Sequence, residues 1–111
     1  MNQKAAALGM TGTHYTNAHG LAQDGLYTTA RDLVILGKEV LKNSMLAEIC
    51  SKTYYEIPAT NMSDVRKIFT TNYMMETTSP YYYKRVKGLK TGYTEKAGRC
   101  LVSYAEKDGA E

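Results

Sequence analysis

The sequence contains no tryptophan, one phenylalanine, two prolines and two cysteines among its 111 residues. Cys50 and Cys100 lie far apart and match no metal-binding spacing, so two buried free thiols are favoured over a disulfide. No apolar run is long enough to cross a membrane. No apolar targeting segment follows Met1, as expected either of a cytosolic protein or of an internal piece of a longer chain.

The net charge is also small, because 14 basic and 11 acidic residues leave a formal charge of +3. The basic residues are scattered apart from a short cluster at 84–87, and no basic stripe interleaved with aromatic residues is present. We therefore expect no nucleic-acid partner. Hydrophobic residues make up 43% of the chain, which is enough to form a core. The 10 tyrosines suit half-buried surfaces, and the three at 81–83 are expected to pack beneath a nearby strand.

The first half of the chain is expected to be helical. Residues 1–8 favour a helix that ends at Gly9 in the left-handed conformation. A loop follows, and a second helix begins at the N-cap Thr29, where Asp32 can complete a capping box. That helix is expected to end near 43–44, and residues 45–51 to form a short third helix.

The second half is expected to contain strands. Residues 53–57 are apolar and aromatic enough for a short strand, whereas 60–69 show no clear pattern. Residues 71–75 fit one helical turn. Residues 86–94 and 99–105 are predicted strands, and the short glycine-containing linker between them predicts an antiparallel hairpin.

Within the strand at 86–94 lies the triplet Lys90-Thr91-Gly92. An acyl-peptide substrate can bind along an exposed strand edge through its main chain. Lys90 would then place positive charge beside a nucleophile, and Thr91 would donate its hydroxyl to a substrate carboxylate. Gly92 would allow close backbone approach, and the Tyr93 amide could face a developing oxyanion. Taken alone, the triplet favours an ordinary edge strand, where lysine discourages aggregation.

A wider set of residues surrounds the triplet and gives it context. It consists of eight blocks at residues 1–5, 8–10, 13–15, 17–21, 27–33, 71–75, 88–94 and 96–102. In their order along the chain, these blocks resemble the serine D-alanyl-D-alanine carboxypeptidases, which are low-molecular-mass penicillin-binding proteins. Lys-Thr-Gly belongs to the motif set of penicillin-binding proteins.

The resemblance implies an α+β fold, part of a penicillin-binding-protein or β-lactamase-like transpeptidase fold. Residues 1–51 would be its helical part, and 52–111 its antiparallel strands with the Lys-Thr-Gly strand. It implies that the parent enzyme removes the terminal D-alanine from peptidoglycan stem peptides ending in D-Ala-D-Ala and is acylated by β-lactams. The enzyme would work outside the cytoplasmic membrane, in the bacterial cell envelope. It would need no cofactor or metal, and would reach the membrane only through segments outside this sequence.

Two of the family's catalytic motifs are not found in this sequence. The nucleophilic Ser-x-x-Lys and the Ser-x-Asn triplet lie upstream in the family, and none of the five serines here precedes a lysine by three positions. Asp108-Gly109 is a hairpin turn signal near the last residue, so a further strand is expected beyond it. We therefore expect no turnover from residues 1–111 alone. The alternatives are a non-catalytic module that binds peptidoglycan or a partner, or a related D,D-endopeptidase or β-lactamase.

The remaining polar residues give weaker hypotheses. His14 and His19 are five positions apart with no third ligand nearby, so a metal site is not expected. The resemblance suggests that His19 is the more firmly fixed of the two. Asp24 and Asp32 are better explained as a turn residue and a helix cap than as an acid pair.

Overall fold

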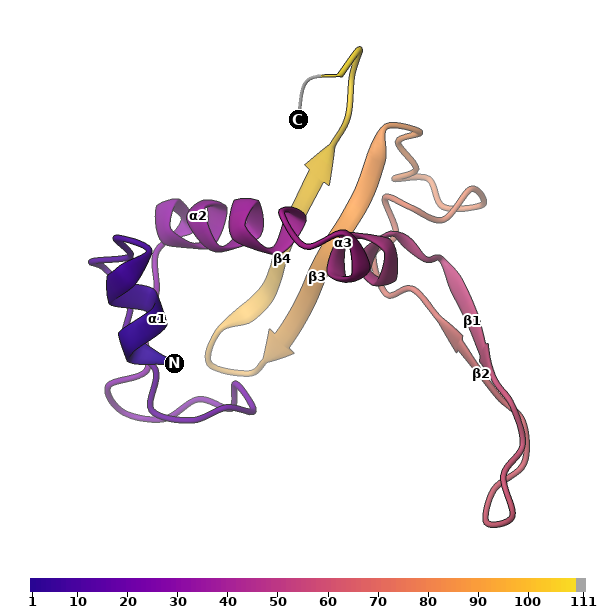
Figure 1. The fold of residues 1–111 in the computed structure, drawn as a ribbon, viewed down its shortest axis with the longest axis horizontal. Helices are drawn as coiled ribbons and strands as arrows, with labels where there is room; N and C mark the ends of the chain where they lie inside the picture. Colours follow the sequence, from indigo (N-terminus) through magenta and orange to yellow (C-terminus); the bar gives the residue numbers. More distant parts are fainter. Residues whose placement is uncertain (110–111) are drawn as a thin grey trace.

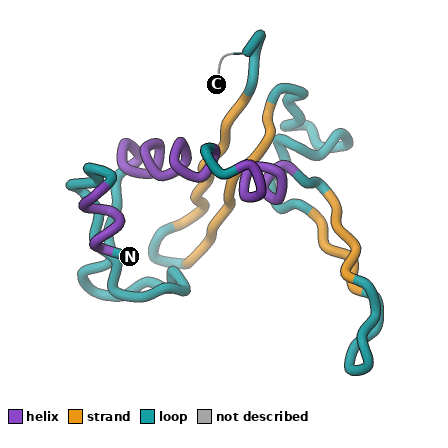
Figure 2. The backbone as a smooth tube through the Cα atoms, in the orientation of Figure 1, coloured by secondary structure: helices purple, strands orange, loops and turns teal. Residues whose placement is uncertain are grey.

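The computed structural model describes residues 1–109 and has an α+β fold in which helices precede strands (Figures 1 and 2). The predicted α+β class and the order of its two parts are therefore confirmed. The helices are α1 (Asn2–Ala7), α2 (Ala30–Leu41) and α3 (Ser44–Ser51), and the strands are β1 (Tyr54–Ile57), β2 (Arg66–Phe69), β3 (Val86–Thr94) and β4 (Gly98–Ala105).

Helix α1 ends as its sequence predicts. Gly9 has φ of 76°, a left-handed conformation that glycine adopts without steric cost. The amide of Met10 reaches back to the carbonyl of Ala5 at 3.0 Å, and that of Gly9 to Ala6 at 3.0 Å. This pair of bonds satisfies carbonyls that the helix leaves unpaired. It also buries Met10 and Ala5, two of the few buried apolar side chains.

Helix α2 begins at Thr29, whose hydroxyl accepts a hydrogen bond from the Asp32 amide at 3.1 Å. The predicted N-cap is confirmed, but the carboxylate of Asp32 does not complete a capping box. It accepts from the Gly12 amide at 2.9 Å and from the Thr13 hydroxyl at 2.6 Å. Asp32 is 4% exposed, so these bonds to the preceding loop compensate for burying its carboxylate.

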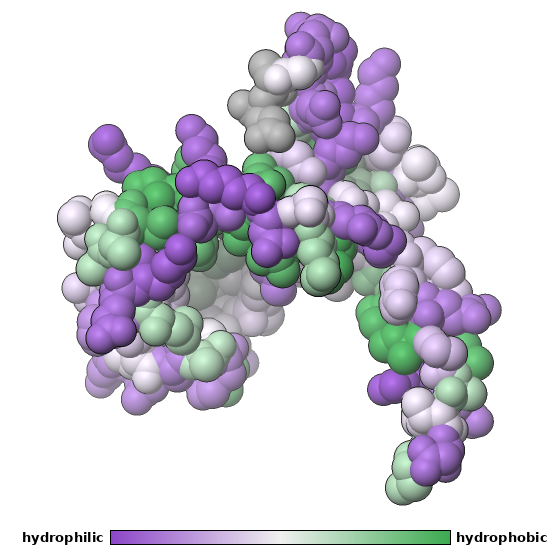
Figure 3. All heavy atoms as spheres, viewed as in Figure 1, coloured by the Kyte–Doolittle hydropathy of each residue, from purple (hydrophilic) through white to green (hydrophobic). Residues whose placement is uncertain are grey.

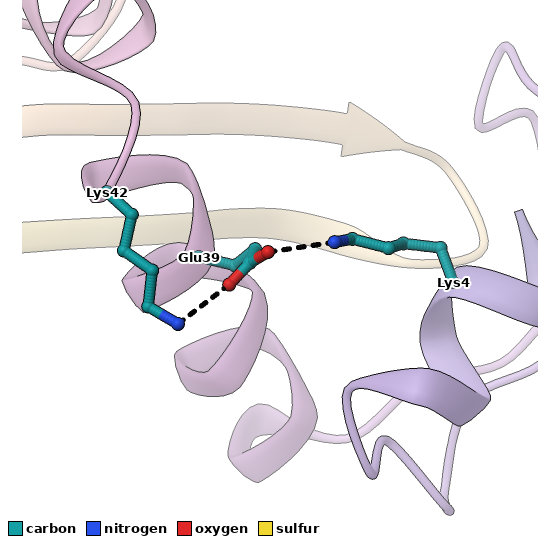
Figure 4. A network of polar contacts seen from close by, with 3 residues as sticks. All are labelled: Lys4, Glu39 and Lys42. Atoms are coloured by element: carbon teal, nitrogen blue, oxygen red, sulfur yellow. Dashed lines mark hydrogen bonds and ion pairs between the residues drawn. The ribbon is translucent and has the colours of Figure 1, made fainter.

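An exposed ion-pair network joins α1 to α2. Glu39 binds Lys4 at 2.8 Å through one carboxylate oxygen and Lys42 at 2.9 Å through the other (Figure 4). Hydrogen bonds from Lys4 and Lys42 lower the pKa of Glu39 from 4.5 to about 2. Both lysines are exposed and Glu39 is half-buried, so solvent and salt screen the network and it contributes little to stability.

Strands β3 and β4 form an antiparallel hairpin that packs against α2 and α3 (Figure 1). This confirms the predicted hairpin. A Cβ on Gly37 of α2 would lie 3.2 Å from a Leu89 methyl and 3.7 Å from a Val102 methyl. A Cβ on Gly88 would lie 3.0 Å from the carbonyl oxygen of Cys50. Glycine at these two positions therefore lets both helices approach the hairpin closely.

Strands β1 and β2 form a second hairpin that extends away from the rest of the chain (Figures 1 and 3). The prediction of β1 is confirmed. Strand β2 lies within residues 60–69, which show no clear pattern of apolar and polar residues. Its four residues are all exposed, so no alternation of apolar and polar residues marks the strand. Cross-strand contact between the rings of Tyr54 and Phe69, 5.2 Å apart, fixes the register instead.

The described chain is more open than a compact domain of its length. Its radius of gyration is 15.9 Å, against about 13 Å for a compact chain of ~100 residues. Its accessible surface is 8674 Å², against roughly 6,100 Å² expected of a compact protein of this mass. Hydrophobic side chains remain on the surface, including those along the β1–β2 hairpin (Figure 3).

Two predictions of burial were wrong. Cys50 and Cys100 are free, as expected, but Cys50 is half-buried and Cys100 exposed. The tyrosines at 81–83 do not pack beneath β3, because all three are exposed. Within residues 1–109, no helix has the length and apolar character needed to span a membrane.

Candidate functional site

One open cavity of about 770 Å³ lies along the β3–β4 hairpin. Three segments that are distant in sequence meet there: the loop after β2, the middle of β3 and the start of β4. The lining residues are Thr71, Asn72, Tyr73, Met74, Tyr81, Lys90, Thr91, Gly92, Tyr93, Arg99, Cys100 and Leu101. This volume falls in the usual range for small-ligand sites.

Strand β3 brings all four candidate residues to this cavity. Lys90, Thr91, Gly92 and Tyr93 are consecutive and pair with Val102, Leu101, Cys100 and Arg99 of β4. Side chains alternate along a strand, so Thr91 and Tyr93 point to one face, and the long side chain of Lys90, from the position between Leu89 and Thr91, still lines the same cavity. A Cβ at Gly92 would meet no atom within 4 Å, so the strand is open at that point. The ammonium of Lys90 lies 2.5 Å from the Thr91 carbonyl oxygen.

The loop after β2 adds a hydroxyl that the sequence analysis missed. Thr71 Oγ1 lies 2.5 Å from Thr91 Oγ1. The predicted helical turn at 71–75 was wrong: the segment is a turn in which the Asn72 carboxamide oxygen accepts from the Met74 amide at 3.1 Å. An asparagine side chain often replaces a backbone acceptor in this way. The Thr71-Asn72 pair after β2 was the available signal, but pairing it with β3 requires the tertiary structure.

Asn72 anchors this loop to the hairpin. It is 5% exposed, and its side-chain amide donates to the Ser103 hydroxyl at 3.3 Å. Ser103 in turn donates to the carbonyl of Gly88. A chain of hydrogen bonds from the buried Asn72 through the exposed Ser103 therefore connects the loop to β4 and β3, and such connected groups hold neighbouring side chains in fixed positions.

An aromatic and basic rim borders the same cavity. Tyr93 is 68% exposed, and the guanidinium of Arg99 lies 5.9 Å from the centre of its ring, within range of a cation–π interaction. Lys90 and Arg99 supply positive charge, and no aspartate or glutamate is among the lining residues described above. Hydroxyl donors and two cations together favour an anionic ligand group such as a carboxylate.

The other polar candidates lie outside this cavity. His14 donates from Nδ1 to the Gly25 carbonyl oxygen at 2.7 Å, and its ring lies tilted against that of Tyr27. His19 accepts from the Leu21 amide at 3.1 Å. Both histidines are thus held by their own loop, and because His14 contacts the Tyr27 ring as well as the Gly25 carbonyl, the expectation that His19 is the more firmly fixed of the two was wrong. Among residues 1–109, no three potential metal ligands come together.

Comparison with known proteins gives a consistent result over the whole chain. A family model described as D-alanyl-D-alanine carboxypeptidase, of peptidase family S11, matches residues 1–111. The D-alanyl-D-alanine carboxypeptidase DacF of Bacillus subtilis is 35% identical over 107 residues, which cover 96% of this chain and 26% of the relative.

Solved structures agree in fold. The Streptomyces K15 DD-transpeptidase superposes with a TM-score of 0.82 at 28% identity, covering 97% of this chain and 41% of that one. Penicillin-binding protein D2 from Listeria monocytogenes, solved in its cefotaxime-bound form, gives 0.75 at 31% identity with coverage of 97% and 41%. The chain thus spans about a quarter of the curated relative and about two fifths of the solved chains.

Proposed function

The chain belongs to the D-alanyl-D-alanine carboxypeptidase family, and we propose that it is the part of such a serine enzyme that binds substrate along strand β3. The reaction is the removal of the terminal D-alanine from peptidoglycan stem peptides by acyl transfer through a serine ester. The observation that carries the proposal is the position of Lys90-Thr91-Gly92 on an open strand, beside a cavity with hydroxyls and cations.

Each residue of β3 has a role that its chemistry allows. The substrate main chain lies along the strand and passes close to Gly92, where no side chain obstructs it. The Thr91 hydroxyl binds the terminal carboxylate, and the Tyr93 amide faces the developing oxyanion. The Lys90 ammonium supplies positive charge beside the serine. Of these residues only Lys90 is catalytic, and the others bind the substrate. The nucleophilic serine belongs to another part of the protein.

We place residues 1–111 within a longer catalytic domain, with 1–51 as its helical part and 52–111 as the sheet part. Two observations support this. The chain spans only 41% of the solved transpeptidase that it resembles, and its surface exceeds that of a compact protein by about 2,500 Å². The rest of the domain supplies the Ser-x-x-Lys and Ser-x-Asn motifs and covers exposed apolar side chains.

The family also indicates the ligands and the location. β-Lactams acylate the same serine, which the cefotaxime-bound relative supports by analogy. Because the substrate is a component of the cell wall, the enzyme works on the outer side of the cytoplasmic membrane, in the cell envelope. The alternative function is a module that binds peptidoglycan through β3 without catalysis, because an open strand edge next to a basic cavity suits that role equally.

The test compares the full-length protein with residues 1–111 alone. We expect the full-length protein to release D-alanine from an acetylated tripeptide ending in D-Ala-D-Ala and to become labelled by a fluorescent penicillin. Residues 1–111 alone should show neither reaction. A full-length protein that binds peptidoglycan but gives no release and no label would favour the binding module. Label mapped to a serine of residues 1–111 would refute the placement of the nucleophile.

A further inference from the structure

We propose that Thr71 is a positioning residue: its hydroxyl donates to Thr91 Oγ1, which directs the proton of Thr91 into the cavity, toward a ligand's free terminal carboxylate. The inference deepens the proposed function and rests on its choice of β3 as the substrate strand. The contact that carries it is the 2.5 Å distance between the two hydroxyl oxygens, which join residues 20 positions apart.

Counting protons shows why the direction of this bond matters. Each threonine hydroxyl has one proton to donate and two lone pairs that accept. If Thr91 donates to Thr71, it has no proton left for a ligand. If Thr71 donates to Thr91, the proton of the Thr91 hydroxyl is free to bind a ligand. The hydrogen bond that the Thr91 oxygen accepts also makes the Thr91 hydroxyl a stronger donor. A carboxylate only accepts hydrogen bonds, so it selects the second arrangement.

Neighbouring hydrogen bonds hold Thr71 in position to donate to Thr91 Oγ1. The next residue, Asn72, is buried and bonded to Ser103 of β4, and its amide donates to the Thr70 hydroxyl at 3.1 Å. The amide of Thr70 donates to the carbonyl of Thr53 at 2.8 Å. These bonds fix the backbone on both sides of Thr71, so its hydroxyl meets Thr91 without ordering a mobile loop when ligand binds.

A consequence follows for specificity. A peptide with a free C-terminal carboxylate accepts the directed proton of Thr91, whereas a peptide with an amidated terminus has a weaker, uncharged acceptor. Hydrogen bonds to charged groups are about twice as strong as those between neutral groups. Thr71 therefore contributes to the preference for a terminal D-alanine over a D-alanine whose carboxyl group is blocked, which is the distinction between a carboxypeptidase and an endopeptidase.

The experiment uses the full-length protein and two acetylated tripeptides, one ending in D-Ala-D-Ala carboxylate and the other in its amide. In Thr71→Val, which keeps the shape but lacks the hydroxyl, we expect kcat/KM for the carboxylate peptide to fall about 10-fold, chiefly through KM. The amide peptide should change less than about 2-fold. Thr71→Ser should restore the preference. Thr78→Val is the matched control, because the Thr78 hydroxyl donates to the Glu76 carboxylate and Thr78 is not among the residues that line the cavity.

Three results would overturn the inference. One is an unchanged preference in Thr71→Val. Another is an equal loss for both peptides, which would indicate a structural role, and the third is failure of Thr71→Ser to restore the preference while its melting curve is normal. Calorimetric binding of the same two peptides separates this inference from the proposed function. If the unmodified protein hydrolyses neither peptide but binds the carboxylate form better, and Thr71→Val abolishes that difference, the inference stands and the proposed activity fails. Binding without a difference contradicts the inference.

Discussion

The two hairpins of this chain have the same antiparallel connection but different surroundings. The β3–β4 hairpin has strands of nine and eight residues, packs against α2 and α3, and carries the buried Val86. The β1–β2 hairpin has two strands of four residues, and every residue except Ile57 is exposed. Packing on one face thus distinguishes a strand pair that can hold a site rigidly from one that extends freely.

The cavities beside the two hairpins differ in the polarity of the residues that line them. The cavity between α3 and the β1–β2 hairpin has a volume of about 640 Å³ and a mostly apolar and aromatic lining, including Met45, Ile49 and Phe69. The cavity beside β3 brings together hydroxyls and cations from three segments. Polar groups that line one cavity indicate a ligand-binding site. An exposed apolar cavity beside an extended hairpin indicates a surface that packs against another part of the protein.

The largest effect should come from removing the polar groups of β3. In the full-length protein, Lys90→Ala and Thr91→Ala should each slow acylation by fluorescent penicillin by on the order of 10²-fold, because each loses a charge-assisted contact to the reacting ligand. Lys67→Ala, in an exposed strand of the other hairpin, should leave the rate unchanged, and so should His14→Ala. Equal acylation rates in Lys90→Ala, Thr91→Ala and Lys67→Ala would show that the β3–β4 hairpin does not hold the binding site.

A smaller effect on activity is expected from a substitution at Gly92, where no protein atom covers strand β3. Gly92→Ala introduces a methyl group that meets no protein atom within 4 Å, so the melting temperature should stay the same. The methyl group would occupy the path of the substrate main chain and reduce kcat/KM for D-alanine release by on the order of 10-fold to 100-fold. Calorimetry and kinetics on one preparation separate the two outcomes. Normal kinetics would mean that the ligand does not approach the strand at Gly92.

The hydrogen bonds of the buried Asn72 side chain should matter for stability. Asn72→Ala removes the bonds of its side chain to the Ser103 hydroxyl and the Met74 amide. Leaving these partners without their bonds should lower the free energy of unfolding by about 1–3 kcal/mol in denaturant titration. Phe69→Ser in the other hairpin, 67% exposed, serves as the comparison within this chain. A larger loss from Phe69→Ser would show that the β1–β2 hairpin is packed in the full-length protein.

The smallest effect concerns the pH dependence of the exposed network. Because the pKa of Glu39 is lowered to about 2, its ionised form stabilises the fold above its ordinary pKa of 4.5. That contribution should decline as the pH falls from about 4.5 through 2. Glu39→Gln should therefore lower the melting temperature slightly at pH 7 and at low salt, and the difference should shrink toward pH 2 and at high salt. Glu48→Gln, which loses one exposed pair with Lys52, is the control.

Sequence reasoning succeeded where local chemistry and packing agree. The helix cap at Thr29, the left-handed Gly9 and the β3–β4 hairpin were all predicted, because capping, turn and alternation signals lie within a few residues. It failed for β2, whose exposed residues show no period, and for the turn at 71–75, which is shaped by the contact of Asn72 with a strand 31 positions away. It likewise missed the pairing of Thr71 with Thr91, because the three-dimensional structure alone brings those residues together.

The central claim, that β3 is the strand that binds substrate, is tested most directly by a crystal structure of the full-length protein acylated by a β-lactam. We predict that the ligand lies along β3 beside Gly92, with its carboxylate within hydrogen-bonding distance of Thr91 Oγ1 and its carbonyl oxygen facing the Tyr93 amide. A covalent ligand that leaves β3 unoccupied, with its carboxylate neither bonded to Thr91 directly nor through a single water molecule, would contradict this claim.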